Sequence, residues 1–234
     1  MALYKYETHL HTKEASACAT CNGAEHARLY KEAGYDGIIV TDHFFNGNSN
    51  VPKDLPWEER IDLFCKGYEN AKEEGDRIGL SVFMGWEAND HGTEFLIYGL
   101  DKAWLKSHPD LLSWSIEEQY QKVHAAGGYV VHAHPFRMRD YIKKVRLFPD
   151  CIDAVEAINL RNGNDEFDQK AFQYAKENDF PVTAGSDAHS SVIHKGGIAF
   201  DHKLLDIFDY IESIKTGSGY QLLGTNKEQG QTGG

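Results

Sequence analysis

The sequence contains no long hydrophobic run. Apolar stretches such as residues 37–40 are far shorter than the roughly 18 residues that a membrane-spanning helix requires. The first residues, 1–7, contain no apolar segment of the secretory type. We therefore expect a cytoplasmic protein that has no membrane partner.

Positive charge is also scarce. The 234 residues include 24 Lys and Arg against 36 Asp and Glu, which gives a formal net charge of −12. Proteins that bind long nucleic acids need a basic surface, so we expect no such partner. A small anionic substrate remains compatible with this charge if metal ions hold it.

Cysteine is sparse and irregularly placed. The four residues are Cys18, Cys21, Cys65 and Cys151, and their scatter does not indicate a disulfide framework. Cys18 and Cys21 have the spacing of a CxxC motif, but no second CxxC completes a zinc set. Ordinary reduced thiols are the expected state.

Short apolar stretches alternate with amphipathic stretches along the chain. Strands are expected at residues 3–9, 36–40, 80–85, 95–98, 129–131, 154–158 and 182–184. Helices are expected at residues 23–33, 56–75, 115–126, 165–178 and 203–215. This alternation is typical of parallel βαβ units, and about seven units predict a single-domain α/β barrel. The expected domain is residues 1–223, followed by a flexible polar tail at 224–234.

Histidines and carboxylates gather where the expected strands end. Five such clusters occur, at His9-Leu10-His11, Asp42-His43, Glu87, His132-Ala133-His134 and Asp187-Ala188-His189. A single cluster would be compatible with buried structural histidines. In a parallel barrel, however, all strand carboxyl ends share one rim, and residues i and i+2 point to the same side of a strand. Five clusters on one rim predict a multinuclear metal site for Zn, Mn or Fe.

The order of the motifs resembles the PHP (polymerase and histidinol phosphatase) family. The matching segments are Glu7–Thr12, Thr41–His43, Gly85–Glu87, His132–Arg137 and Gly185–His189. The resemblance spans roughly residues 5–200. It implies a distorted TIM-like (β/α)7 barrel, two or three divalent metal ions and phosphoester hydrolysis.

The resemblance also implies particular metal ligands. They are His9, His11, His43, Glu87, His134, Asp187 and His189. His9, His11, Glu87 and Asp187 would bind a first ion. Glu87 would bridge to a second ion, which His134 also binds, and His43 and His189 would hold a third. His132 is expected to pack in the interior.

Two positions depart from the family pattern. The family often has Asp or His five or six residues after the second histidine of HxH, where this chain has serine and alanine. Either Glu14 or Cys18 takes that place, or the third metal site is weak. The family also commonly has a His at the start of the strand after Glu87. Here Glu94 is favoured over His91, and the alternative for Glu94 is a solvated acid at a strand end.

Other residues are candidates for contact with substrate. Arg137 follows the expected strand at 129–131 and could grip a phosphate with two parallel hydrogen bonds; a surface salt bridge is the alternative. Arg139 and Arg161 are weaker candidates for that role. His194 could protonate a leaving group. Asp187, Arg137 and His194 are thus the expected catalytic residues.

The expected activity is hydrolysis of a small phosphate monoester by metal-activated water, with histidinol phosphate one candidate. The alternatives are a phosphodiesterase acting on cyclic phosphates or oligonucleotide ends, a different hydrolysis such as that of an amide, and a non-catalytic metal-bound regulatory module. Specificity is expected to depend on the loops at residues 46–55 and 101–113. The sequence gives no indication of oligomeric state.

Overall fold

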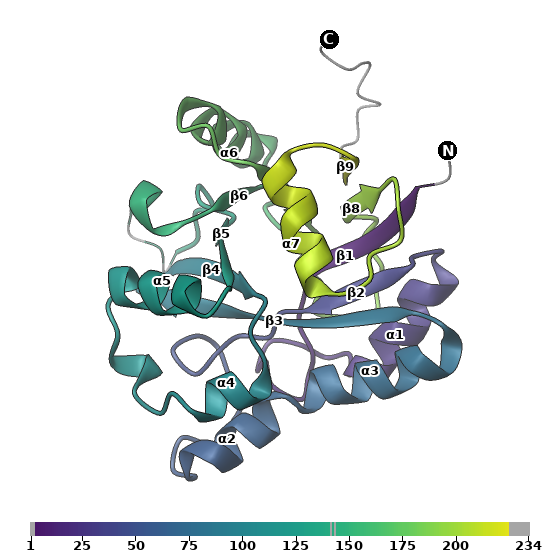
Figure 1. The fold of residues 1–234 in the computed structure, drawn as a ribbon, viewed down its shortest axis with the longest axis vertical. Helices are drawn as coiled ribbons and strands as arrows, with labels where there is room; N and C mark the ends of the chain where they lie inside the picture. Colours follow the sequence, from purple (N-terminus) through teal and green to yellow (C-terminus); the bar gives the residue numbers. More distant parts are fainter. Residues whose placement is uncertain (1–2, 141, 143, 225–234) are drawn as a thin grey trace.

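The computed structural model describes residues 3–140, 142 and 144–224. In this part of the chain, one mixed sheet curls into a nearly closed barrel, with strand order β7-β6-β5-β4-β3-β2-β1-β8-β9 (Figure 1). The strands are β1 (Tyr4–Leu10), β2 (Gly37–Val40), β3 (Ser81–Asp90), β4 (Thr93–Tyr98), β5 (Tyr129–Ala133), β6 (Ala154–Asn159), β7 (Val182–Gly185), β8 (Gly197–Phe200) and β9 (Tyr220–Leu223). The expected flexible tail lies outside the described residues, except for Gly224.

The carboxyl ends of β1 and β7 meet and nearly close the barrel. Leu10 and Ala188 form a parallel bridge, and the His11 amide donates to the Ala188 carbonyl over 2.8 Å. Farther down, the Thr8 hydroxyl donates to the Ala184 carbonyl at 2.5 Å. The histidines of β1 therefore lie directly beside the segment that follows β7.

The expectation of parallel strands throughout is wrong for β4. This strand pairs antiparallel with both β3 and β5, because only His91 and Gly92 connect it to β3. Both residues have positive φ, 51° and 89°, as a two-residue hairpin turn requires. The hairpin brings Glu94 opposite Asn89, so the beginning of β4 lies at the same rim as the end of β3. The antiparallel strands β8 and β9 were not expected from the sequence.

The five expected helices are present with different extents, and a short helix within the loop expected at 101–113 was not predicted. They are α1 (Gly23–Glu32), α2 (Trp57–Phe64), α3 (Lys66–Ile78), α4 (Lys102–Lys106), α5 (Ile116–Ala125), α6 (Asp165–Glu177) and α7 (Ile207–Thr216), with two short 3-10 turns, η1 (Leu111–Ser113) and η2 (Pro149–Cys151). The single helix expected at 56–75 is two helices that meet at Cys65. The expected Ser115 cap is confirmed, with a reciprocal capping box to Glu118. Among the described residues, no helix is long and apolar enough to cross a membrane.

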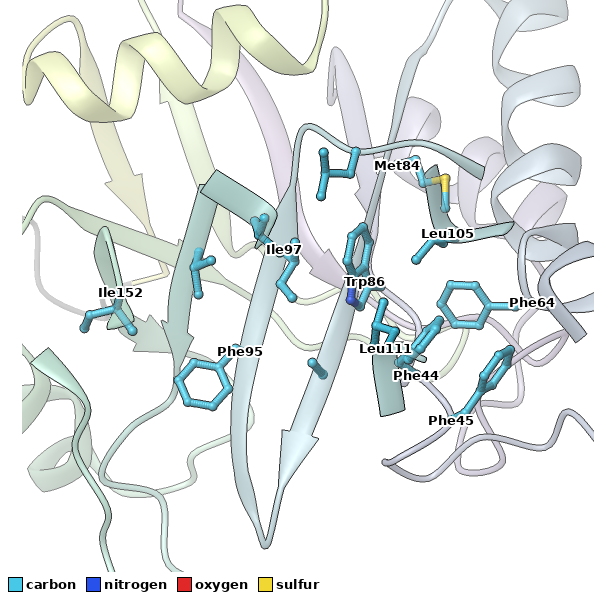
Figure 2. Close-up of a cluster of buried hydrophobic side chains, with 14 of the residues drawn as sticks. Phe44, Phe45, Phe64, Met84, Trp86, Phe95, Ile97, Leu105, Leu111 and Ile152 are labelled. Carbon is cyan, nitrogen blue, oxygen red and sulfur yellow. The ribbon is translucent and has the colours of Figure 1, made fainter. Parts of the chain in front are cut away.

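A large aromatic cluster packs on the outer face of the β3–β4 hairpin (Figure 2). Trp86 is fully buried there, and the ring of Phe44 lies 5.1 Å from that of Phe64 on α2. Because side chains alternate along a strand, Trp86 points into this cluster while Glu87 points into the barrel. The aromatic packing thus fixes the direction of Glu87.

Helices α1 and α3 pack side by side, with α1 against β2 and α3 against β3 (Figure 1). Their approach requires glycine, because a Cβ at Gly23 would collide with the Gly67 carbonyl. A Cβ at Gly67 would in turn collide with the side chains of Thr12 and Asp42. This close contact seats α3 under the loop that follows β1.

Candidate metal centre

The rim of the barrel gathers eight expected ligands from six segments. They are His9, His11, His43, Glu87, Glu94, His134, Asp187 and His189, and all but Glu94 are buried. Their donor atoms form four overlapping groups in which all atoms lie within 4.8 Å of one another. The structure therefore brings together residues that are up to 180 positions apart in the chain.

The first group consists of His9, His11 and Asp187. Nε2 of His9 and Nε2 of His11 face each other at 3.1 Å, and Oδ1 of Asp187 lies 3.3 Å from Nε2 of His11. Two facing imidazole nitrogens and a carboxylate oxygen all point at one place. This convergence is the arrangement that a single metal ion needs.

Glu87 lies between several of these histidines. Its Oε1 is 3.3 Å from His9 Nε2 and 3.2 Å from His134 Nε2. Its Oε2 is 2.6 Å from His43 Nδ1 and 3.7 Å from His11 Nε2. Because the two oxygens face different sets of nitrogens, this one carboxylate could bind two neighbouring ions.

Glu94, and not His91, reaches the cluster. Oε2 of Glu94 lies 3.5 Å from Nε2 of His134, and the Asn89 amide donates to its Oε1 over 3.0 Å. His91 occupies the hairpin turn, and its side chain is 86% exposed. Burial and the neighbouring Glu87 charge raise the pKa of Glu94, as expected where acidic groups crowd together.

A third group consists of His11, His43 and His189. The His11 ring centroid lies 4.2 Å from each of the other two. Burial opposes ionisation of the Cys18 thiol, but the neighbouring His189 and His43 outweigh it and lower its pKa to about 6. The structure thus places Cys18 beside the third group.

The expectation that Glu14 is a metal ligand is wrong, because its carboxylate is bound elsewhere. Its carboxylate accepts hydrogen bonds from the Gly23 amide at 3.1 Å and from the Asn70 side chain at 2.9 Å. Gly23 is the first residue of α1, where unpaired amides and the helix dipole attract a carboxylate. Glu14 therefore faces the end of the helix instead of the rim.

Both histidines of the first HxH motif face the metal centre, whereas only the second histidine of the other motif does. Backbone conformation explains this difference. His134 follows β5 with φ 30° and Asp187 follows β7 with φ 56°, a strained region for non-glycine residues that often occurs at functional sites. At His134 this conformation breaks the strand alternation, so the prediction that His132 and His134 point together is wrong. His132 instead stacks on Phe95, with centroids 5.2 Å apart, in the packing role expected for it.

Arg137 is buried at the rim, so the alternative of a surface salt bridge is wrong. Its Nη2 lies 2.8 Å from Oδ2 of Asp187 and donates to Asn159 at 2.5 Å. Its Nε donates to Asn162 over 2.9 Å. Burial opposes the charge of Arg137, but Asp187 outweighs it and raises the pKa. Arg137 thus holds one oxygen of Asp187 and leaves the other to the histidines.

Glu156 is a site residue that the sequence did not reveal. Its carboxylate contacts His9 Nδ1 at 2.8 Å and accepts from the His134 amide at 3.0 Å and from the Asn159 side chain at 2.9 Å. Burial opposes charge on His9, but Glu156, Asp187 and Glu87 raise its pKa well above the usual value. A single acidic residue within the otherwise apolar strand at 154–158 was the available signal.

A cleft of about 610 Å³ opens over the centre. The carboxylates of Glu87, Glu94 and Asp187 line it together with Arg137, Arg139 and Arg161. A neighbouring hollow of about 330 Å³ shares Arg161 and Asp187 with the cleft and includes His194. His194 is exposed and lies beside the metal centre rather than in it.

The buried donor set fits divalent metal ions. Histidine nitrogens and carboxylate oxygens are the ligands that Zn, Mn and Fe accept. Burial would favour protonated acids here, yet the facing cations hold the pKa values of Glu87 and Asp187 well below the usual range. The carboxylates are therefore charged and available as ligands.

Comparisons with known proteins agree with the fold. The family model described as PHP-associated matches residues 166–191. The chain is similar to a two-domain protein from Bacteroides vulgatus containing a predicted PHP-like metal-dependent phosphoesterase, with 14% identity, a TM-score of 0.70 and coverage of 95% of this chain and 65% of that one. The chain thus spans about two thirds of that protein's length. A search of curated proteins finds no match.

Two further solved structures share the fold. One is a protein from Bifidobacterium adolescentis that is described as a predicted metal-dependent phosphoesterase. It has 18% identity and a TM-score of 0.58, and the match covers 92% of this chain and 96% of that one. The other is PsfC from Pseudomonas syringae, with 18% identity, a TM-score of 0.64 and coverage of 97% and 93%. At 14–18% identity these structures show a shared fold, and the family-model match is confined to residues 166–191.

Proposed function

We propose that the protein is a metal-dependent phosphoesterase that hydrolyses a small phosphate monoester with metal-activated water. The observation that carries the proposal is the buried Glu87 carboxylate, with histidines facing both of its oxygens. Arg137 lines the same cleft. The phosphoesterase descriptions of structurally similar proteins support the same reaction class.

Two or three ions of Zn, Mn or Fe are the proposed cofactors. His9, His11, Glu87 and Asp187 would hold one ion, with Glu87, His134 and Glu94 at the next position. Bound ions of this kind lower the pKa of a coordinated water towards about 7 and neutralise phosphoryl charge. The protein's own contribution is to hold these donor atoms close together at the rim of the barrel.

The other polar residues of the cleft orient the substrate. Arg137 is buried, permanently charged and fixed by Asn159 and Asn162, so its guanidinium can attract phosphate oxygens without a large loss of side-chain freedom. Arg139 and Arg161 add positive charge on the cleft wall. His194 in the neighbouring hollow is the proposed proton donor to the leaving group.

A monoester fits this cleft better than a long diester chain. Its dianion carries more charge for the three arginines to pair with, and the net charge of −12 disfavours a nucleic-acid polymer. A phosphodiesterase acting on cyclic phosphates or oligonucleotide ends is the alternative within the same chemistry.

The test is phosphate release from a panel of monoesters and cyclic diesters, with Mn, Fe or Zn supplied and a chelator control. Chelator-sensitive release is expected, with monoesters preferred. Faster cleavage of a diester would reverse the substrate assignment. An absence of turnover while the metals are bound would favour an amide substrate or a regulatory module instead.

A further inference from the structure

Another cavity, of about 320 Å³, lies beside the metal cleft. Ala88 and Phe95, which line it, belong to the aromatic cluster on the outer face of the β3–β4 hairpin. Asn46 and Asn89 line both this cavity and the metal cleft. The two hollows therefore meet at these two asparagines.

The two asparagines connect the cavity to a residue of the metal centre. The side-chain amide of Asn89 donates to Oε1 of Glu94 over 3.0 Å, and its backbone amide donates to the side-chain oxygen of Asn46 over 3.2 Å. Glu94 belongs to the group of His43, Glu87 and Glu94 whose donor atoms lie within 4.8 Å of one another. The wall of the cavity is thus one hydrogen bond away from a proposed metal ligand.

Aromatic and aliphatic side chains contribute to the lining of the cavity. They are Phe95, Leu111, Leu112, Trp114 and Ile116. The indole nitrogen of Trp114 donates to the Asp110 carboxylate over 2.9 Å, so the polar atom of this ring is already paired. Leu111 and Leu112 come from the loop at 101–113 and Asn46 from the loop at 46–55, which are the two loops expected to determine specificity. A cavity of this size with apolar walls and a few polar groups is typical of small-molecule sites.

One buried polar side chain of the cavity has no partner. Gln119, on α5, is only 9% exposed and lines the cavity. Its side-chain amide makes no hydrogen bond within residues 3–140, 142 and 144–224. The Asp90 carboxylate, in contrast, accepts a hydrogen bond from Arg146 over 2.6 Å. Buried amides are rarely left unpaired, and a ligand group that both donates and accepts would satisfy Gln119.

We propose that this cavity binds the organic part of the phosphate ester, and that this part is a planar ring whose edge carries an amide-like donor and acceptor. The ring packs against Trp114 and Leu112, its edge pairs with the Gln119 amide, and the phosphate lies in the metal cleft beyond Asn89. This inference rests on the proposed function and names the substrate class of the same site. The cavity is called the ring pocket below.

The kinetic test compares the 4-carbamoylbenzyl, benzyl and ethyl esters of phosphate, hydrolysed by the full-length protein with metal supplied. All three are esters of primary alcohols, so their leaving groups differ mainly in the ring. The KM of the carbamoylbenzyl ester is expected to be at least about tenfold below that of the ethyl ester. Gln119→Met should narrow the difference in KM between the carbamoylbenzyl and benzyl esters by about threefold or more. Gln121→Met changes an exposed glutamine of the same helix and should keep the native difference.

Two further measurements do not depend on Gln119→Met being active. Leu112→Glu alters a side chain that is 41% exposed, so it should fold, and it should raise the KM of both ring esters relative to the ethyl ester. In the 15N-labelled native protein, 4-carbamoylbenzyl alcohol without phosphate should shift the side-chain amide signal of Gln119. This signal is assigned by its absence in Gln119→Met, and the signal of Gln121 should stay in place.

Each result has a defined meaning. A Gln119 signal that the alcohol does not shift would overturn the ring pocket. Equal KM values for the three esters in the native protein, or an unchanged ratio of KM values in both Gln119→Met and Leu112→Glu, would do the same. Failure of the phosphoesterase proposal is distinguishable, because it appears as no phosphate release from any ester while the alcohol still shifts the Gln119 signal.

Discussion

The carboxylate of Glu156 lies 2.8 Å from Nδ1 of His9, and this contact determines which nitrogen of His9 faces the metal centre. A hydrogen held between Nδ1 and Glu156 leaves Nε2 free to bind an ion. Nε2 is the atom that lies 3.3 Å from Glu87 and 3.1 Å from His11. A carboxylate behind a ligand histidine commonly sets its tautomer and increases its basicity.

Replacing Glu156 should therefore weaken metal binding. We expect Glu156→Ala to lower metal affinity by about 10–100-fold, and Glu156→Gln to lower it less, because the amide oxygen can still accept from Nδ1. Calorimetric metal titration is the measurement. The exposed Glu177→Gln is the control. Equal affinities in Glu156→Ala and the native chain would contradict the assigned role.

Loss of a central ligand should abolish hydrolysis. His11→Ala or Asp187→Ala is expected to remove turnover while the circular dichroism spectrum stays native, since each removes a donor from the first group. His202→Ala changes a histidine that is 46% exposed in its side chain and should leave turnover unchanged. Near-normal activity in either ligand variant would refute the metal assignment.

Arg137 should contribute to binding of the phosphoryl group. We expect Arg137→Ala to reduce kcat/KM for phosphate monoesters by at least tenfold, on the order of 1.4 kcal/mol. Arg137→Lys should recover little of the lost kcat/KM, because the hydrogen bonds to Asn159 and Asn162 need the planar guanidinium group. Steady-state kinetics with a monoester checks this, and an unchanged kcat/KM for Arg137→Ala would show that the residue acts only in the structure.

Metal removal should also lower thermal stability. Without ions, Glu87, Glu94 and Asp187 remain close together with fewer opposing charges, and any ion that binds only the folded state adds about 2.7 kcal/mol at 100-fold excess over Kd. Thermal unfolding with and without chelator should show a lower Tm after chelation, restored by added metal. The shift should shrink in Asp187→Ala. A chelator-independent Tm in the metal-loaded native chain would contradict the prediction.

The packing of α3 against the segments that follow β1 and β2 can be tested through Gly67. Gly67→Ala is expected to destabilise the fold by about 1–3 kcal/mol, since the added methyl would meet Thr12 and Asp42. Gly47→Ala is the control, because its Cβ would make only ordinary contacts. Urea unfolding gives both values. Equal stability of the two variants would show that α3 can move away without cost.

Local pattern was sufficient to place seven of the strands and most helices, although β3 runs on to Asp90 and β5 to Ala133. Ser115, with acids in the following turn, predicted the start of α5, and the capping box confirms it. The break at Cys65 was not predictable, because the apolar periodicity continues through it. The direction of β4 was misjudged because its hydrophobic pattern is the same in either direction, and only the two-residue turn at His91 and Gly92 reverses the chain.

The sequence by itself determined that histidines and carboxylates lie at or near the ends of successive strands of an α/β barrel. The alternation of side chains along a strand and the residues that end a strand are local properties of the sequence. Only the tertiary structure decided which of them meet. The positive φ of His134 points its side chain away from the direction of His132. The first turn of α1 binds the Glu14 carboxylate. The curvature of the barrel places Glu156 behind His9. Those outcomes depend on distances between segments far apart in the chain, which no local pattern records.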